Sequence, residues 1–271
     1  MAGVLLFVVP SIQDHAVCVR HWDWSETSQT VSLMTREHGL IRCIAKGSKR
    51  EKSAFSGGLE IATMGHMVAI VKPSTDLALL TSWDLIEPMH LIRHSLERYQ
   101  ACMFVIDLIP RMINDHDPHP GIYDALIGTL MELTDLDSCS SLDQIHAQLA
   151  WYLWQLLEHT GAKPELMVDV FTGKSLDEDA QIFGFSPEHG GVVTDPKGDN
   201  HRPEIHELSD AWRVRRTTVE LLRCLHSGDV PADFEHVSVE QMGRVGGLLA
   251  AYIRAMIGSD VPSLRLIYPS V

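Results

Sequence analysis

Basic residues cluster in one short stretch of an otherwise acidic chain. The 271 residues carry a formal net charge of −14 and include 22 Lys and Arg residues. Six of those 22 fall within positions 36–52, namely Arg36, Arg42, Lys46, Lys49, Arg50 and Lys52. With only Glu37 and Glu51 beside them, this segment has a net charge of +4, which leaves −18 for the remainder. Clustered cations suit phosphate contacts, so one small surface is predicted to bind an anionic partner.

A nucleic acid is a partner that this cluster would fit. The cations would hold phosphates, and Trp22, Trp24 and Phe55 are the nearby aromatic side chains that could stack on bases. Each of the three aromatics could instead be a core residue or a turn anchor. The cluster itself could be a solvated loop that offsets local acids, and charge alone supports both interpretations equally.

A second basic group lies near the C-terminus. The stretch "AWRVRRTTVELLRCL" places Arg213, Arg216 and Arg223 near one helical stripe, interrupted by Glu220. Guanidinium groups form paired hydrogen bonds with carboxylates, so the stripe predicts a docking site for an acidic peptide. An ordinary amphipathic helix with a cationic outer face would show the same pattern.

Candidate catalytic residues are few and poorly spaced. The stretch "INDHDPHPG" contains the potential metal ligands Asp115, His116, Asp117 and His119. Their spacing matches no common zinc or two-metal site, and the two prolines indicate a linker between helices. In "SPEHGG", Glu188 and His189 flank a glycine turn without an identifiable nucleophile. The sequence has no GxSxG, HExxH or phosphate-binding glycine loop, so we predict no enzyme; a hydrolase using the Asp115–His119 cluster is the alternative.

The remaining composition is that of a globular intracellular protein. The five cysteines (Cys18, Cys43, Cys102, Cys139 and Cys224) are scattered and form no CxxC pair. We therefore expect buried free thiols in a reducing cytoplasm. The apolar run Val4–Val9 is too short to span a bilayer and lacks a basic n-region, so residues 1–14 are predicted to be an N-terminal extension.

Periodicity divides the chain into strands followed by helices. Strand-like alternation occurs at 16–22, 28–35, 40–46, 59–72 and 77–87, which predicts a small closed barrel for residues 15–88. Arg42 and Lys46 share strand parity and should emerge on one face, opposite Cys43 and Ala45. After Pro88, apolar residues recur at helical spacing, so residues 89–271 are predicted to be helical, with helices near 205–225 and 239–257 and an irregular insert at 161–203.

The stretch "SETSQTVSLMTREHGLIRCIAKGSKREKS" resembles the first domain of the RecO family of recombination mediators. That domain has a Trp-Ser-Glu or Tyr-Ser-Glu turn, a strand ending in T-x-E-x-G and a third strand leading into a basic loop. Downstream, "LEIATM", "GAKPEL" and "FSPEHGGVV" follow in the family's order, so the resemblance extends from about His15 to the C-terminus. It implies an α+β protein with an N-terminal five-stranded OB-fold barrel, followed by an all-helical C-terminal domain.

The resemblance also implies a function in DNA repair and homologous recombination. Such a protein would bind single- and double-stranded DNA, anneal complementary strands and help load RecA onto strands coated by single-stranded-DNA-binding protein. RecR would be a partner, and the helical domain would receive the acidic C-terminal tail of the coating protein. The location would be the cytoplasm, at the nucleoid during repair. The net charge of −14 supports the alternative, a protein-interaction module on the same scaffold without a DNA role.

The sequence departs from the family at a zinc site. Many members carry two CxxC pairs in the region of the irregular insert, and alignment places Asp169, Thr172, Thr194 and Lys197 at those four positions. A structural zinc site of this kind needs four thiolates. We therefore predict a zinc-finger-like segment that lacks the cysteines, and a protein without a cofactor.

Overall fold

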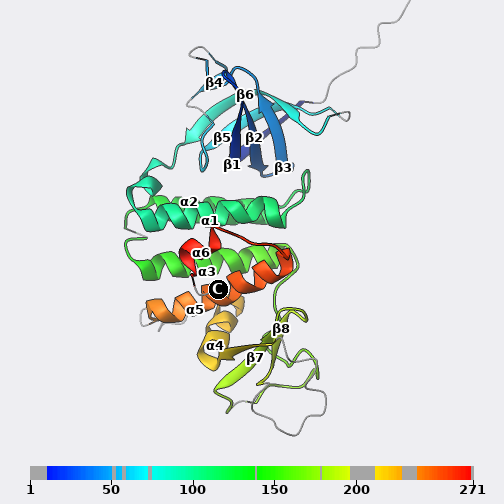
Figure 1. Ribbon diagram of the computed structural model, residues 1–271, viewed down its shortest axis with the longest axis vertical. Coiled ribbons are helices and arrows are strands. Elements are labelled where there is room, and N and C mark those ends of the chain that lie inside the picture. Colours follow the sequence, from blue (N-terminus) through cyan, green and yellow to red (C-terminus); the bar gives the residue numbers. More distant parts are fainter. Residues whose placement is uncertain are drawn as a thin grey trace, which may run out of the picture. The chain divides into compact units, whose positions relative to one another are not determined.

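The computed structural model describes residues 11–50, 53–56, 59–72, 75–137, 139–177, 179–195, 211–227 and 237–269 (Figure 1). The chain divides into two compact units, residues 1–135 and residues 136–271. Lys52 and Lys197, two residues with predicted roles, lie outside the described residues. No helix in the described ranges is long and apolar enough to cross a bilayer.

The first unit begins with a closed barrel, as the sequence predicts. Its strands are β1 (Ser11–Ser25), β2 (Ser28–Thr35), β3 (Gly39–Ala45), β4 (Phe55–Ser56), β5 (Met64–Ile70) and β6 (Ala78–Glu87). The five longer strands pair in the order β3-β2-β1-β5-β6, and a parallel pairing of β3 with β6 closes the barrel. Strand β1 begins at Ser11, so the last four residues of the predicted extension pair with β5 instead.

Alternation along β3 explains why this segment forms a barrel wall. Ile41, Cys43 and Ala45 are fully buried in the barrel core, while Arg42 and the following Lys46 are exposed on the other face. The predicted turn before β3 requires glycine, because Gly39 has φ +71° and an added Cβ would lie 2.2 Å from the backbone oxygen of Asp117. The predicted parity of β3 is therefore confirmed.

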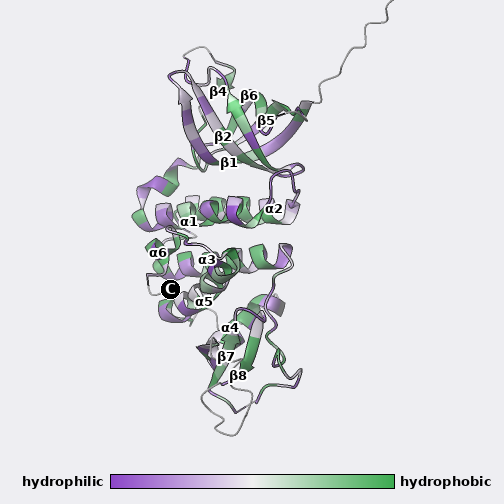
Figure 2. Cartoon of the chain, turned by 45° about the vertical axis from the view of Figure 1, so that its right-hand side comes forward, coloured by the Kyte–Doolittle hydropathy of each residue, from purple (hydrophilic) through white to green (hydrophobic). Residues whose placement is uncertain are grey.

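Two helices belong to the same compact unit as the barrel. After the 3-10 helix η1 (His90–His94) come α1 (Leu96–Met112) and α2 (Pro120–Thr134), each with hydrophobic and hydrophilic residues (Figure 2). An ion pair of 3.0 Å between Arg20 of β1 and Asp107 of α1 joins helix and barrel. The predicted boundary near Pro88 thus marks the change from strands to helices, whereas the first compact unit continues to residue 135.

The second unit combines helices with a small sheet. Its elements are α3 (Leu142–His159), β7 (Ile182–Ser186), β8 (Gly191–Thr194), β9 (Trp212–Arg215), α4 (Arg216–Ser227), α5 (Val239–Ile257) and α6 (Leu264–Ile267). Helices α3 and α5 pack together, and each begins with a serine capping box. The strands pair in the order β8-β7-β9, so the insert predicted to be irregular contains β7 and β8.

The helix predicted at 205–225 is wrong at residues 212–215, and its residues 205–210 lie outside the described residues. Residues 212–215, predicted to be helical, form strand β9, which pairs with β7 from Trp212↔Phe185 to Arg215↔Ile182. Helix α4 begins only at Arg216. Long-range pairing with β7 decides this conformation, and a local periodicity does not report such pairing.

Candidate nucleic-acid interface

The predicted basic loop begins as an ordered turn. Lys46–Arg50 directly follow β3. Three hydrogen bonds tie this turn to the start of β2: Gly47 N to Ser28 Oγ (3.1 Å), Lys49 N to Thr27 O (3.2 Å) and Ser48 Oγ to Gln29 Oε1 (3.0 Å). The cations of this turn are therefore held at a defined place on the barrel.

Three of the six predicted cations already have carboxylate partners. Arg36 donates to both carboxylate oxygens of Asp124 (3.0 and 3.1 Å), and these hydrogen bonds raise the pKa of the Arg36 guanidinium. Arg42 pairs with Asp115. Lys49 pairs with Asp23, and this hydrogen bond lowers the pKa of the aspartate. Arg36 and Arg42 therefore attach the barrel to α2 and to the α1–α2 linker.

Lys46 and Arg50 are the predicted cations that remain accessible to an anion. Both side chains are exposed, and neither forms an ion pair with any residue in the described part of the chain. Lys49 lies between them on the same turn. Among the predicted cations that the structure describes, those without an ion pair therefore lie on the 46–50 turn.

The aromatic candidates divide into one core residue and two exposed ones. Phe55 is only 7% exposed and belongs to the barrel core. Trp22 and Trp24 are 51% and 62% exposed on β1. The basic turn is bonded to the β1–β2 hairpin that carries both tryptophans, through the pairing of Lys49 with Asp23. Exposed aromatics and cations therefore meet at one end of the barrel.

The register places Trp22 on the outer face of the barrel. Trp22 pairs with Thr30 of β2, and Thr30 pairs with Ile44 of β3. Residues directly opposite one another point to the same side of a sheet. Trp22 therefore lies on the same outer face as Arg42 and Ile44 of β3 and the following Lys46. A strand lying on this face could stack its bases on tryptophan while its phosphates reach the turn.

The Asp115–His119 cluster has separate partners rather than a common centre. Asp115 pairs with Arg42, His119 Nε2 lies 3.1 Å from Asp117 Oδ2, and the backbone N–H of His116 donates to Leu40 O. Nowhere in the described ranges are three His, Cys, Asp or Glu side chains grouped to hold a metal. These contacts are those of a linker between α1 and α2 that packs on the barrel.

The positions aligned with zinc ligands form a hydrogen-bonded cluster around Asp169. This carboxylate is 2% exposed. Its Oδ1 accepts from the backbone N–H groups of Phe171 (3.0 Å) and Thr172 (2.9 Å). Its Oδ2 accepts from the backbone N–H and the hydroxyl of Thr194, both at 2.8 Å. Burial raises the pKa of Asp169, but the hydrogen bonds to the ionised form outweigh burial and lower it below the ordinary value.

A zinc ion does not fit this cluster. One carboxylate and two hydroxyls replace thiolates at the three described positions. Each oxygen of the Asp169 carboxylate already accepts two hydrogen bonds from the protein. Structural zinc sites use cysteine and histidine. The carboxylate instead joins the 169–172 turn directly to β8.

The three arginines predicted to share a helical stripe do not. Arg213 lies in β9, before the helix, and donates to both oxygens of Asp195 (3.2 and 2.9 Å). Arg216 pairs with Glu220 at 2.6 Å. Arg223 donates to the backbone oxygen of Leu166 through Nε (2.9 Å) and Nη2 (2.6 Å). Arg223 is thus a structural residue.

A groove in the second unit was missed from the sequence. It has a volume of about 780 Å³ and lies between β9, α5 and the C-terminal residues 267–269. Arg213, Arg215, Arg244 and Arg254 line it, around apolar residues that include Val214 and Leu248. Of the predicted arginines only Arg213 contributes. The sequence signal was weak because Arg244 and Arg254 lie on a different helix, and only folding brings them beside β9.

Comparison with known proteins agrees with this architecture. The models "Recombination protein O N terminal" and "Recombination protein O C terminal" match residues 10–89 and 93–265. The DNA repair protein RecO of Rhodopirellula baltica is 29% identical, over 73% of this chain and 70% of its own length. The corresponding protein of Idiomarina loihiensis is 28% identical, over 73% and 82%. That of Myxococcus xanthus is 26% identical, over 93% and 94%. The chain therefore belongs to the RecO family of DNA repair proteins.

Proposed function

We propose that this protein is a recombination mediator that binds DNA through the end of its barrel. One observation carries the proposal: the exposed Trp22 and Trp24 lie on the hairpin to which the cationic 46–50 turn is bonded. Phosphates would contact Lys46, Lys49 and Arg50, and bases would stack on the tryptophans. Such contacts do not read sequence, which suits a protein that must act on any damaged site.

The proposed activity consists of binding and exchange, without a chemical step. Holding one strand by its backbone leaves the pairing edges of most bases free, so a complementary strand can anneal. In the cytoplasm, at the nucleoid, the protein would displace single-stranded-DNA-binding protein locally and help RecA to load, with RecR as a partner. Family membership supports these roles, and the division of the chain into two compact units suits a protein with two partners.

The second unit offers a surface for the acidic tail of the coating protein. We propose that the tail binds in the groove beside Arg215 and Arg254, because guanidinium groups complement acidic side chains and these two have no ion-pair partner among the described residues. Arg213, Arg216 and Arg223 fit this role less well, since Asp195, Glu220 and the Leu166 carbonyl already engage them.

A salt titration of single-stranded DNA binding tests the proposal. With about three phosphates neutralised, log K against log salt should have a slope of roughly −2. Replacing Lys46 and Arg50 together by alanine should weaken binding to all sequences and flatten the slope by about 1.4. Replacing Lys174 and Arg265, which are exposed in the second unit, changes net charge equally and should leave the slope unchanged.

The alternative is a protein-interaction module without a DNA role. The net charge of −14 favours it, because most of the surface repels phosphates. If the Lys46/Arg50 variant binds DNA with the parent's affinity and slope, the turn is a solvated loop and this alternative replaces the proposal.

A further inference from the structure

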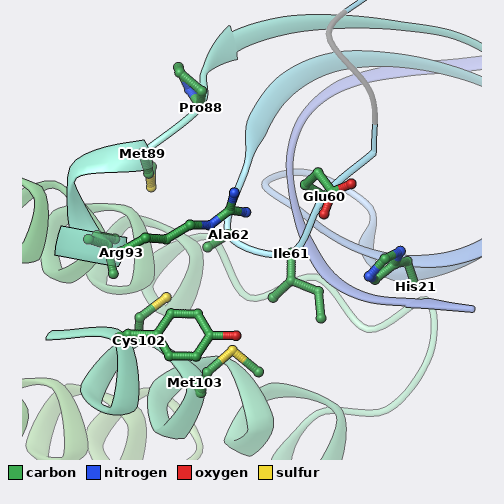
Figure 3. Close-up of a pocket in the computed structure, with 11 residues that line it drawn as sticks. His21, Glu60, Ile61, Ala62, Pro88, Met89, Arg93, Cys102 and Met103 are labelled. Carbon is green, nitrogen blue, oxygen red and sulfur yellow. The ribbon is translucent and has the colours of Figure 1, made fainter. Parts of the chain in front are cut away.

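A pocket of about 410 Å³ lies in the first unit, between the 60–63 turn of the barrel, η1 and α1 (Figure 3). Ile61 approaches from the barrel side and Met103 from α1, and the Arg93 guanidinium extends from η1 toward Ala62. The walls are mainly apolar, and four polar side chains line the pocket: His21, Glu60, Arg93 and Tyr99. This composition is typical of a site for a small, largely apolar group that also has hydrogen-bonding atoms.

The polar side chains offer both donors and an acceptor. Within the described residues, neither the Glu60 carboxylate nor the Arg93 guanidinium forms an ion pair or a side-chain hydrogen bond. His21 Nδ1 lies 3.2 Å from Gln29 Nε2, which can only donate, so the ring proton of neutral His21 is on Nε2. The pocket therefore presents N–H donors from His21 and Arg93 and a carboxylate acceptor from Glu60.

The backbone around the pocket adopts an uncommon conformation. Ala62 has φ +65° and Met89 has φ +49°, in the left-handed region that residues with a side chain rarely occupy. The backbone N–H of Ala62 donates to Cys18 O at 2.9 Å, which ties this turn to β1. Such strain persists where surrounding contacts enforce it, and it concentrates at ligand sites. Two walls of the pocket are thus held in place rather than free to collapse.

We propose that this pocket accepts one unstacked nucleobase of a single DNA strand. A base has two flat apolar faces, which suit the walls, and an edge with donors and acceptors, which suits Arg93, His21 and Glu60. A phosphate has only acceptors, so the Glu60 carboxylate opposes it. The proposal rests on the proposed DNA-binding function and adds a consequence to it: paired bases cannot enter the pocket, so binding favours single strands.

The pocket and the candidate interface use opposite faces of the same part of β1. His21 lies opposite the core residue Val31, whereas the next residue, Trp22, points to the outer face. On its other side, His21 contacts Gln29, which accepts from the Ser48 hydroxyl of the basic turn at 3.0 Å. The basic turn and the pocket are therefore linked through Gln29, and a strand bound at the turn would have to cross the edge of β1 for one base to reach the pocket.

Two variants and three DNA probes test this inference. Tyr99 is 43% exposed, so Tyr99→Ala removes an aromatic wall without disturbing the core. Met103, one turn further along the same helix, also lines the pocket, and Met103→Trp would fill it. The probes are an oligothymidylate, an abasic strand of equal length and a duplex. Leu96→Ala is the matched control, because Leu96 is 66% exposed on α1 and does not line the pocket. Melting curves check that each variant is folded.

We expect each pocket variant to lower affinity for oligothymidylate about tenfold, the effect of losing one base–aromatic contact. Affinity for the abasic strand and the duplex should stay within about twofold of the parent, and Leu96→Ala should bind all three probes normally. Unchanged oligothymidylate affinity in Tyr99→Ala, or an equal loss for the abasic strand and duplex, would overturn the pocket's assignment. A parent that binds none of the probes would instead overturn the proposed function.

Discussion

Replacing Asp169 by asparagine removes the charge that joins the 169–172 turn to β8. Each carboxylate oxygen of Asp169 accepts two hydrogen bonds, at distances of 2.8–3.0 Å. An asparagine has one acceptor oxygen, and its NH₂ group would face two donors in place of the other oxygen. Two bonds to a charged acceptor are lost, each contributing about 1.5–3 kcal/mol, so the free energy of unfolding should fall by roughly 3–6 kcal/mol.

The assay is thermal unfolding followed by circular dichroism. At about 2–4 °C per kcal/mol, Asp169→Asn should melt about 6–24 °C below the parent. Asp177→Asn is the control, because Asp177 lies in the same segment but is exposed, and its variant should melt within about 2 °C of the parent. Thr194→Val, which removes only the hydroxyl donor, should cost about 1.5–3 kcal/mol.

The pH dependence gives an independent check. The pKa of Asp169 is lowered in the folded protein, so its stabilisation is present above the ordinary aspartate pKa of about 3.9 and is lost as the pH falls through the folded value. The difference in free energy of unfolding between the parent and Asp169→Asn should therefore be constant near neutral pH. It should become smaller as the pH falls below about 4.

A metal would change these outcomes. If a zinc ion joined the two segments, a chelator would lower the melting temperature of the parent, and purified protein would contain one zinc per chain. We expect neither. A chelator-sensitive parent, or an Asp169→Asn variant that melts with the parent, would refute the reasoning that a carboxylate joins these segments.

Two further predictions follow from the fold and the groove. Arg254→Ala should weaken binding of an acidic tail peptide about tenfold, measured by calorimetry, without changing the melting temperature. Arg223→Ala should lower the free energy of unfolding by about 1–3 kcal/mol, because the Leu166 carbonyl loses its donor, and should leave peptide binding unchanged. If Arg223→Ala weakens peptide binding and Arg254→Ala does not, the groove is not the tail site. Gly39→Ala should destabilise the barrel by several kcal/mol, since its Cβ would lie 2.2 Å from Asp117 O at a φ of +71°, and an unfolding midpoint equal to the parent's would contradict this.

Patterns with a short period predicted much of the architecture. Alternation along β2, β3, β5 and β6 reports which side chains face the core, so the five-stranded barrel and the parity of Arg42 and Lys46 could be read from sequence. Helical spacing predicted the change to helices after Pro88 and the bounds of α5 for the same reason. The basic cluster and the missing zinc cysteines are properties of composition and order, which need no coordinates.

Only the tertiary structure decided which of these residues are available to a partner. Arg36 pairs with Asp124, 88 positions away, and Arg42 with Asp115, because folding brings α2 and its linker against the barrel. Phe55 is buried, whereas Trp22 and Trp24 are exposed, a difference that no local pattern contains. Arg213 joins Arg254 in a groove because β9 pairs with β7 rather than extending α4. Charge and residue type are local properties of a chain, but burial and pairing depend on what the rest of the chain places beside each residue.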